Sequence, residues 1–514
     1  MVDAFLIVVA VACSIILFAC CVVLVVKFSH RDDQNNAKFP KFVVVSGLWL
    51  AAASLLLMPY DVANSRGNGG GLEIGVLWQV MYITLAVYVF ALIPFAYFFY
   101  ESDTALPTED NAPTSFCQTQ TGAAMLYTVI FSAIFICLLA ILYSFLNMAE
   151  IPYQKLEVDF TSPNYFQFSQ NISLEEALRA RASRGNPAVS STNFWNVPIT
   201  FPVYVVALLS FLGWFSFTVF VGVGFMALPL DLINEFRTRP KPMSTKAWVQ
   251  QKKALGAKAA HLLGIGEQLK DLSNQEQKTR KQRREYKKFI RVFEKNFYFL
   301  KRDYDILHAA HKLKAQNKLW YMLSLFLGVV SFVLSASWIA HVSLFMLPNK
   351  PVNDFLNVFF IWLENAPGPG FPLFGIVAYG MWSLYLLCCV VKGNLKLGLR
   401  MLLWRIYPME VGKTYMNSFL VNTWLVLLCS VPAVQFCTMA FPVYARFTDI
   451  DMLFGSQIKY LKFFRIFWEK NIFTIATLAI SFITFIWLIV HPVDQDRKIN
   501  EQLEAMAKKK PERV

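Results

Sequence analysis

Nine uninterrupted apolar runs, each long enough to cross a bilayer as a helix, constrain this chain more than any other feature. A transmembrane helix needs about 20 predominantly apolar residues, because each residue advances it by only about 1.5 Å. The runs occupy residues 5–26, 40–59, 76–99, 122–147, 203–228, 319–347, 372–391, 418–441 and 471–490. They predict an all-α fold, a polytopic transmembrane bundle of about nine helices. We expect the first run to be a retained helix, because no basic segment precedes it.

The composition points to the same class of protein. Apolar residues make up 56% of the 514 residues and charged residues only 16%, whereas soluble chains carry about 25% charged residues. The mean hydropathy is +0.44, so the apolar surface needs lipid to cover it. The net charge of +14 would suggest nucleic acid only if it lay on a soluble recognition domain.

Lysine and arginine gather in alternate loops, and this asymmetry predicts the orientation. Basic residues are frequent in the loops 27–39 and 392–417 and in the tail, so we expect the N-terminus outside and the C-terminus in the cytosol. Two loops fit less well, because 100–121 carries only acids and the predicted external loop 442–470 holds five basic residues. The one N-x-Ser/Thr sequon starts at Asn171, a glycosylation candidate in the predicted outer loop 148–202.

One hydrophilic segment, residues 229–318, carries nearly all of the net charge. It holds 22 Lys or Arg against nine Asp or Glu, a balance of +13. Its second part lacks proline and repeats apolar residues at helical spacing, which predicts a cytosolic helical hairpin. The expected domains are therefore an N-terminal bundle (1–228), this basic loop (229–318), a C-terminal bundle (319–491) and a basic cytosolic tail (492–514).

Three interpretations of the basic loop remain open. The charge can reflect positive-inside topology alone, contact with anionic lipid headgroups at roughly 1 kcal/mol per cation, or binding of a protein partner. No recognition fold accompanies the charge, so we do not expect nucleic acid. The densest cations are the candidates for membrane-surface or partner contact: Lys281, Arg283, Arg284, Lys287 and Lys288.

Polar residues in or beside the spans are candidates for a ligand site or transport path, since they are costly in lipid. Asp61 and Asn64 follow Pro59 at the outer end of the second run, and a second Pro-x-Asp-x-x-Asn motif places Asp231 after the fifth. The pair could mark an inverted repeat, or each aspartate could cap a helix end.

The remaining candidates are His341, Asn417, Asn422 and Gln435. Histidine could bind a proton or ligand, or be a hydrogen-bonded packing residue. The amides could line a path or join helices through hydrogen bonds worth roughly 0.6 to 2 kcal/mol each. No nucleotide, hydrolase or metal-binding motif is present in the sequence, so we predict neither an enzyme nor a cofactor.

Several segments, in their order and spacing, resemble the LIMR family of lipocalin-interacting and limb-region membrane proteins, with its plant and protist branch most similar. The resemblance covers nearly the whole chain. The matching stretches include residues 39–45, the turn 59–64, and residues 93–101, 200–207, 222–230, 337–341, 408–409, 416–420 and 435–437.

This resemblance implies nine transmembrane helices with a large cytosolic loop between the fifth and sixth. It also implies either of two functions. One is a receptor or scaffold that binds an extracellular or lumenal ligand, such as a lipocalin-like carrier, and couples to cytosolic trafficking or signalling partners. The other is a transporter of a small organic molecule, as in cobalamin exporters. The family further implies a plasma or endolysosomal membrane, and the sequence leaves the oligomeric state open.

Overall fold

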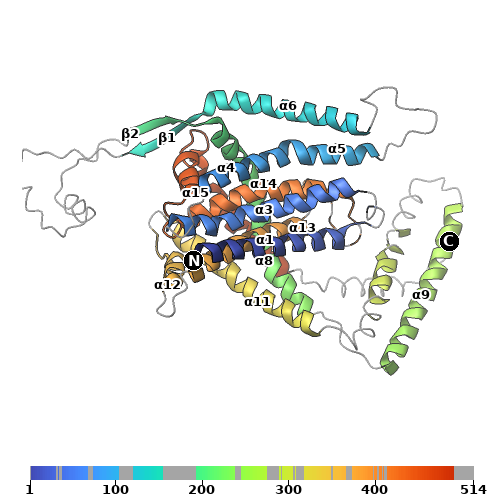
Figure 1. Ribbon diagram of the computed structural model, residues 1–514. Helices are drawn as coiled ribbons and strands as arrows, with labels where there is room; N and C mark the ends of the chain where they lie inside the picture. Colours follow the sequence, from blue (N-terminus) through green and yellow to red (C-terminus); the bar gives the residue numbers. More distant parts are fainter. Residues whose placement is uncertain are drawn as a thin grey trace, which may run out of the picture. The chain divides into compact units, whose positions relative to one another are not determined.

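The computed structural model describes two compact units, residues 1–228 with 333–514, and residues 229–332. The described residues are 2–490 except 31–32, 34–36, 67–72, 104–119, 154–192, 238–244, 275–288, 291, 294, 305–306, 308–317, 349–350, 366–372, 398, 402–403, 408, 410–411 and 413. The first unit is a helical bundle (Figure 1), and each unit is described by itself below.

Within the described residues, nine helical segments are long and apolar enough to cross a membrane, which confirms the prediction of an all-α bundle. They are α1 (Val2–Phe28), α3 (Lys38–Ser65), α4 (Ile74–Val87) continued by η1 (Tyr88–Leu92) and α5 (Ile93–Asp103), α6 (Gln120–Leu146), α8 (Phe201–Arg237), α11 (Lys318–His341) continued by η3 (Val342–Met346), α13 (Leu373–Leu397), α14 (Met416–Ala440) and α17 (Ile472–Val490).

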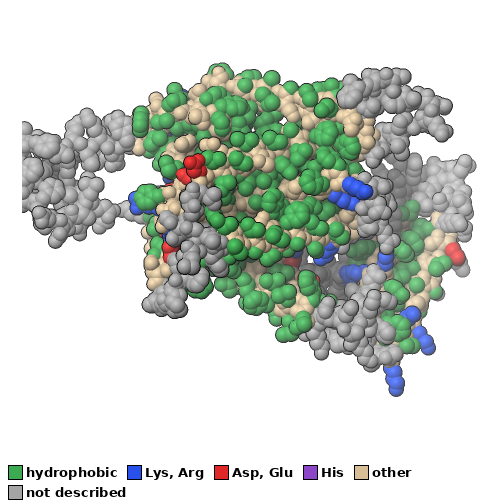
Figure 2. Space-filling view, viewed as in Figure 1, with side chains coloured by type: hydrophobic (Ala, Val, Ile, Leu, Met, Phe, Trp, Pro, Cys, Tyr) green, Lys and Arg blue, Asp and Glu red, His purple; other side chains and the backbone are tan. Residues whose placement is uncertain are grey.

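Helix α14 forms the centre of the bundle and is buried along nearly its whole length. It packs against α3, α13 and α5. By contrast, α1 and α6 expose most of their apolar side chains on the flank of the bundle. Figure 2 shows this flank as a broad hydrophobic surface with charged side chains towards its ends. Such a surface is stable only against lipid.

Small residues bring the backbones of α8, α13 and α14 into contact. A Cβ atom at Gly224 would collide with the carbonyl of Cys389, and one at Gly393 would collide with that of Phe220. Gly213 lies in the same way against the carbonyl of Leu428. Helices in lipid associate through such close packing, because the hydrophobic effect does not drive apolar surfaces together there.

Two π-helical turns interrupt the spans and leave backbone carbonyls without a helical partner. Neighbouring helices supply the missing donors at η1, where Trp424 donates to the carbonyl of Val89 at 3.0 Å and Ser132 to that of Phe90 at 2.8 Å. At η3, the side chain of Asn471 donates to the carbonyl of Met346 at 3.1 Å. The turns therefore join α14, α6 and the segment before α17 to their neighbours.

One end of the bundle, called here the β-hairpin end, carries the strands β1 (Met148–Tyr153) and β2 (Asn193–Pro198), paired antiparallel from Met148↔Pro198 to Tyr153↔Asn193. The segment 441–471, called here the collar, lies at this end. It contains α15 (Asp449–Asp451), η4 (Met452–Ile458) and α16 (Arg465–Glu469). The short helix α12 (Phe355–Glu364) and the N-terminus are also at this end (Figure 1).

At the opposite end, called here the Asp33 end, Phe28, His30 and Asp33 contact Thr414 and Met416. The amide of His30 donates to the carbonyl of Thr414 at 3.0 Å, and Thr414 donates to the carbonyl of Phe28 at 3.1 Å. The strands β3 (Leu399–Met401) and β4 (Trp404–Tyr407) precede this contact.

The second unit, residues 229–332, contains α9 (Thr245–Asn274) and the adjoining parts of α8 and α11. Ser324 of α11 donates to the carbonyl of Leu232 at 3.2 Å and to the carboxylate of Glu235 at 3.1 Å. Residues 295–304 are helical, as the periodicity predicts, while the turn of the expected helical hairpin lies outside the described residues.

Candidate functional sites at the two ends of the bundle

Asp61 is almost fully buried at the β-hairpin end, with 1% of its surface exposed. Its Oδ2 accepts hydrogen bonds from the indole of Trp78 at 2.9 Å and from the amide of Ile450 at 3.0 Å, and its Oδ1 accepts one from the amide of Asp449 at 3.2 Å. The first amides of a helix have no partner inside it and attract negative charge. Asp61 therefore caps α15 from another helix.

Thr448 completes this cap from within the collar. Its hydroxyl accepts the amide of Asp451 at 3.2 Å, so all three amides of α15 are bonded. Capping was one of the two roles that the sequence left open for Asp61, although the helix that it caps begins 388 residues along the chain. Asp231, in the matching motif, is half-buried in the other unit.

Arg66 ties the end of α3 to the collar and to α12. It donates to the carbonyl of Tyr444 at 3.0 Å, lies 4.4 Å from the centre of the Tyr444 ring and forms an ion pair with Glu364. Burial raises the pKa of Tyr444 to about 12, while Arg66 acts in the opposite direction. The phenol is therefore neutral over the physiological range.

His341 lies in a second buried cluster at the same end. Its ring stacks on Phe345 and Phe441, at centroid distances of 5.0 and 5.3 Å, and its Nε2 lies 2.8 Å from the carbonyl of Ala440. Asn357 also donates to that carbonyl, at 3.3 Å. Nδ1 of His341 has no hydrogen-bond partner among the described residues. Nε2 is the donor in this contact, which leaves Nδ1 as an acceptor in the neutral imidazole.

Of the other candidates, Gln435 lies in the core and Asn64 is half-buried near the end of α3. The side-chain oxygen of Gln435 accepts the hydroxyl of Ser210 at 2.5 Å and the indole of Trp214 at 2.8 Å. These bonds fix α8 against α14 and use the amide oxygen fully, so Gln435 acts as an interhelical bridge.

Asp33, at the opposite end, is a buried carboxylate that the sequence did not single out. It is 6% exposed, and it accepts the hydroxyl of Tyr100 at 2.9 Å and the amide of Met416 at 3.1 Å. Met416 is the first residue of α14. Asp33 thus caps α14 across the chain in the same manner as Asp61 caps α15. One of two adjacent aspartates in a short loop gives no sequence signal for this role.

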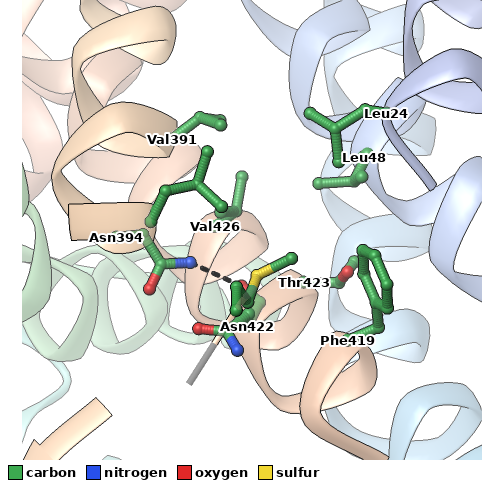
Figure 3. A pocket seen from close by; sticks show the side chains of 10 residues that line it. Leu24, Leu48, Val391, Asn394, Phe419, Asn422, Thr423 and Val426 are labelled. Atoms are coloured by element: carbon green, nitrogen blue, oxygen red, sulfur yellow. Dashed lines mark hydrogen bonds between the residues drawn. The ribbon is translucent and has the colours of Figure 1, made fainter. Parts of the chain in front are cut away.

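Asn417 and Asn422 lie near the start of α14 at the Asp33 end. The side-chain oxygen of Asn417 accepts the amide of Ser418 at 2.7 Å, as a local turn contact. Asn422 is 2% exposed and donates to the carbonyl of Ser418 at 2.7 Å. It lines a cavity of about 20 Å³ together with Asn394 of α13, another residue that the sequence did not single out. Figure 3 shows both side chains among the residues that line it, with the Asn394 amide donating to the main-chain carbonyl of Asn422.

The six membrane candidates thus do not form one cluster. Asp61 and His341 lie at the β-hairpin end, Asn417 and Asn422 lie at the Asp33 end, and Gln435 is near the collar end of α14. The remaining candidates are outside the described residues: Asn171 and the basic group Lys281, Arg283, Arg284, Lys287 and Lys288. Among the described residues, no group of three or more His, Cys, Asp or Glu side chains is placed to hold a metal ion.

Comparison with known proteins identifies the family. A family model described as LMBR1-like membrane protein matches residues 6–300 and 267–489. The chain belongs to this family. A LIMR family protein of Dictyostelium discoideum is 34% identical over 524 residues, covering 97% of this chain and 100% of the relative. LIMR family proteins of Arabidopsis thaliana and Oryza sativa are 34% and 33% identical, covering 94% of this chain and 95% and 96% of the relatives.

These matches confirm the resemblance read from the sequence, including its plant and protist side. No solved structure matches the chain. The LMBR1-like family therefore establishes an integral multi-pass membrane protein, in agreement with the nine apolar helices.

Proposed function

We propose that this LMBR1-like protein is a multi-pass membrane receptor or scaffold without enzymatic activity. In this proposal the β-hairpin end faces the extracellular or lumenal side and binds a protein ligand, for which a lipocalin-like carrier is the class implied by the family. The segment 229–318 faces the cytosol and engages trafficking or signalling partners. The protein resides in the plasma or endolysosomal membrane, with its N-terminus outside and its C-terminus in the cytosol.

The observation that carries this proposal is the anchored β-hairpin. The amide of Glu150 donates to the carbonyl of Tyr460 at 2.9 Å, and that of Lys462 to the carbonyl of Met148 at 3.1 Å. Arg465 stacks over Phe194 at 4.6 Å. The collar therefore holds the hairpin in place, as a surface for a protein partner requires, because a rigid surface loses little entropy on binding.

The same hairpin exposes aromatic side chains suited to recognition. Phe194 is 44% exposed and Trp195 67% exposed, on the strand that leads out of the 148–202 segment. Tryptophan is enriched among the residues that dominate protein interfaces. The positive-inside rule supports an extracytosolic β-hairpin end, since the loops 27–39 and 392–417, which connect spans at the opposite end, are rich in basic residues.

On the cytosolic side, we propose that basic helices contact anionic lipid headgroups. Helix α9 carries Lys246, Lys252, Lys253 and Lys258, and cations beside an anionic membrane each contribute roughly 1 kcal/mol.

A ligand-capture experiment tests the receptor proposal. The full-length protein in nanodiscs, with a photocrosslinker at position 195, is exposed to a panel of soluble lipocalins. We expect crosslinking that Phe194→Ala weakens by at least tenfold, while Trp487→Ala, an exposed aromatic change on α17, leaves it unchanged. Equal crosslinking in the two variants, or none with the folded parent protein, would contradict the proposal.

The second candidate function is transport of a small organic molecule, cobalamin-exporter-like in type. Buried polar side chains near both ends of the bundle favour it, since Asp61, His341 and Asn422 are each at most 2% exposed. The test is uptake of labelled cobalamin by proteoliposomes. Uptake that His341→Phe abolishes in a folded protein would support transport, and a folded parent protein that moves no substrate would remove this candidate.

A further inference from the structure

Two amide oxygens in the membrane bundle lack a hydrogen-bond donor within the part of the chain that the structure describes. Oδ1 of Asn394 and Oδ1 of Asn422 are buried without a partner among the described residues, and each side chain is 2% exposed. Leaving a polar group unsatisfied at membrane depth is costly, because no solvent is present to replace the missing bond. A pair of such atoms on neighbouring helices therefore requires an explanation.

Both side chains line the same cavity, between α13, α14 and the inward faces of α1 and α3. Figure 3 shows Asn394 and Asn422 on one side of it, with Leu24 and Leu48 across from them. The cavity measures about 20 Å³, which is enough for one water-sized molecule. Among the described residues, its lining contains no acidic or basic side chain, and the polar lining residues are the two asparagines and Thr423.

Reassigning the amide atoms does not remove the problem. The nitrogen of Asn422 donates to the carbonyl of Ser418 at 2.7 Å, so exchanging its oxygen and nitrogen would bring two oxygens face to face. The nitrogen of Asn394 already donates to the carbonyl of Asn422 at 3.4 Å. An occupant of the cavity that satisfies both oxygens must therefore offer each of them a hydrogen-bond donor or a positive charge.

We propose that this cavity is a binding site for one water-sized species that bridges Asn394 of α13 and Asn422 of α14. The shared chemistry is attraction to the lone pairs of two neutral amide oxygens, which a water molecule meets by donating hydrogen bonds and a monovalent cation by being coordinated. An uncharged lining does not suit a divalent cation, which selects carboxylate ligands. The proposal concerns the bundle itself and does not depend on the receptor function.

A double-mutant cycle on the full-length protein tests the bridge. The single variants Asn394→Leu and Asn422→Leu should each lower the thermal unfolding midpoint, because each strands the other oxygen. The midpoint of the double variant should fall by clearly less than the sum of the two single decreases, since no unpaired acceptor remains. The control cycle uses Asn417→Leu, the same change on α14 outside the cavity, and should be additive with Asn394→Leu.

Two further measurements identify the occupant. The unfolding midpoint is compared in sodium, potassium, ammonium and choline chloride at equal ionic strength, and a cryo-EM map is inspected between the two amides. A cation is assigned if the map shows density between the amides and the unfolding midpoint depends on the cation, and if this dependence is lost in Asn422→Leu. Density with no cation dependence assigns water. An additive cycle together with an empty cavity, at a resolution that shows other buried waters, overturns the proposal.

Discussion

Replacing Asp61 by asparagine tests the cap that joins α3 to the collar. The carboxylate accepts three hydrogen bonds, two from the amides of Asp449 and Ile450 and one from Trp78. An asparagine keeps one oxygen, so its NH2 group must face at least one of these donors. A buried hydrogen bond to a charged group contributes about 1.5–3 kcal/mol.

We therefore expect Asp61→Asn to lower the free energy of unfolding by about 2–4 kcal/mol, counting the lost bond and the weaker helix cap. Asp61→Ala removes all three bonds and should cost more. The matched control is Asp449→Asn, which makes the same chemical change on an exposed side chain and should stay within about 0.5 kcal/mol of the parent.

The assay is equilibrium unfolding in a lipid-like detergent, combined with hydrogen exchange of residues 449–458. Asp61→Asn should speed exchange there, because the amides of α15 lose their acceptor. A variant as stable as the parent, with unchanged exchange in this segment, would refute the capping role.

Three further predictions follow from buried groups elsewhere. Asp33→Asn should lower the free energy of unfolding by about 1–3 kcal/mol and speed hydrogen exchange at the start of α14, since it disturbs the hydrogen bonds from Tyr100 and Met416. Unchanged hydrogen exchange there would contradict this. Gly393→Ala should lower the free energy of unfolding by about 1–3 kcal/mol, because its methyl group would overlap the carbonyl of Phe220. Gly256→Ala, which has open space around it, should raise the free energy of unfolding by up to about 1 kcal/mol. Burial raises the pKa of Asp354 above its ordinary value of 3.8, so its contribution to stability is complete below that value and is lost as the pH rises through the folded-state pKa. Stability measured from pH 7 down to about 4 should thus rise more steeply in the parent than in Asp354→Asn, and equal slopes would count against this burial effect.

The helices could be predicted from the sequence because the length of an apolar run is a local property. The nine runs correspond to the nine apolar helices among the described residues, and the family resemblance agrees with them. The role of Asp33 could not be predicted in this way, since it bonds the amide of a residue 383 positions away. Asn394 was missed for a similar reason, because its cavity exists only after α13 packs on α14.

The collar shows why charge counting alone was ambiguous for residues 442–470. Arg465 lies 3.6 Å from Glu150 and 2.5 Å from Glu469, so part of the basic charge is paired within the folded segment. The positive-inside rule concerns charges during insertion and does not include such later pairing. Packing against β1 places this segment at the same end as the paired strands β1 and β2.

The most direct test of the account is the side of the membrane on which each end lies. A glycosylation reporter inserted at residue 110, between α5 and α6, is compared with one inserted at residue 455, in the collar, in the full-length protein. The account predicts a glycan at 455 and none at 110. A glycan at 110, or an unmodified reporter at 455, would contradict the assignment of the collar and the β-hairpin to the extracytosolic side.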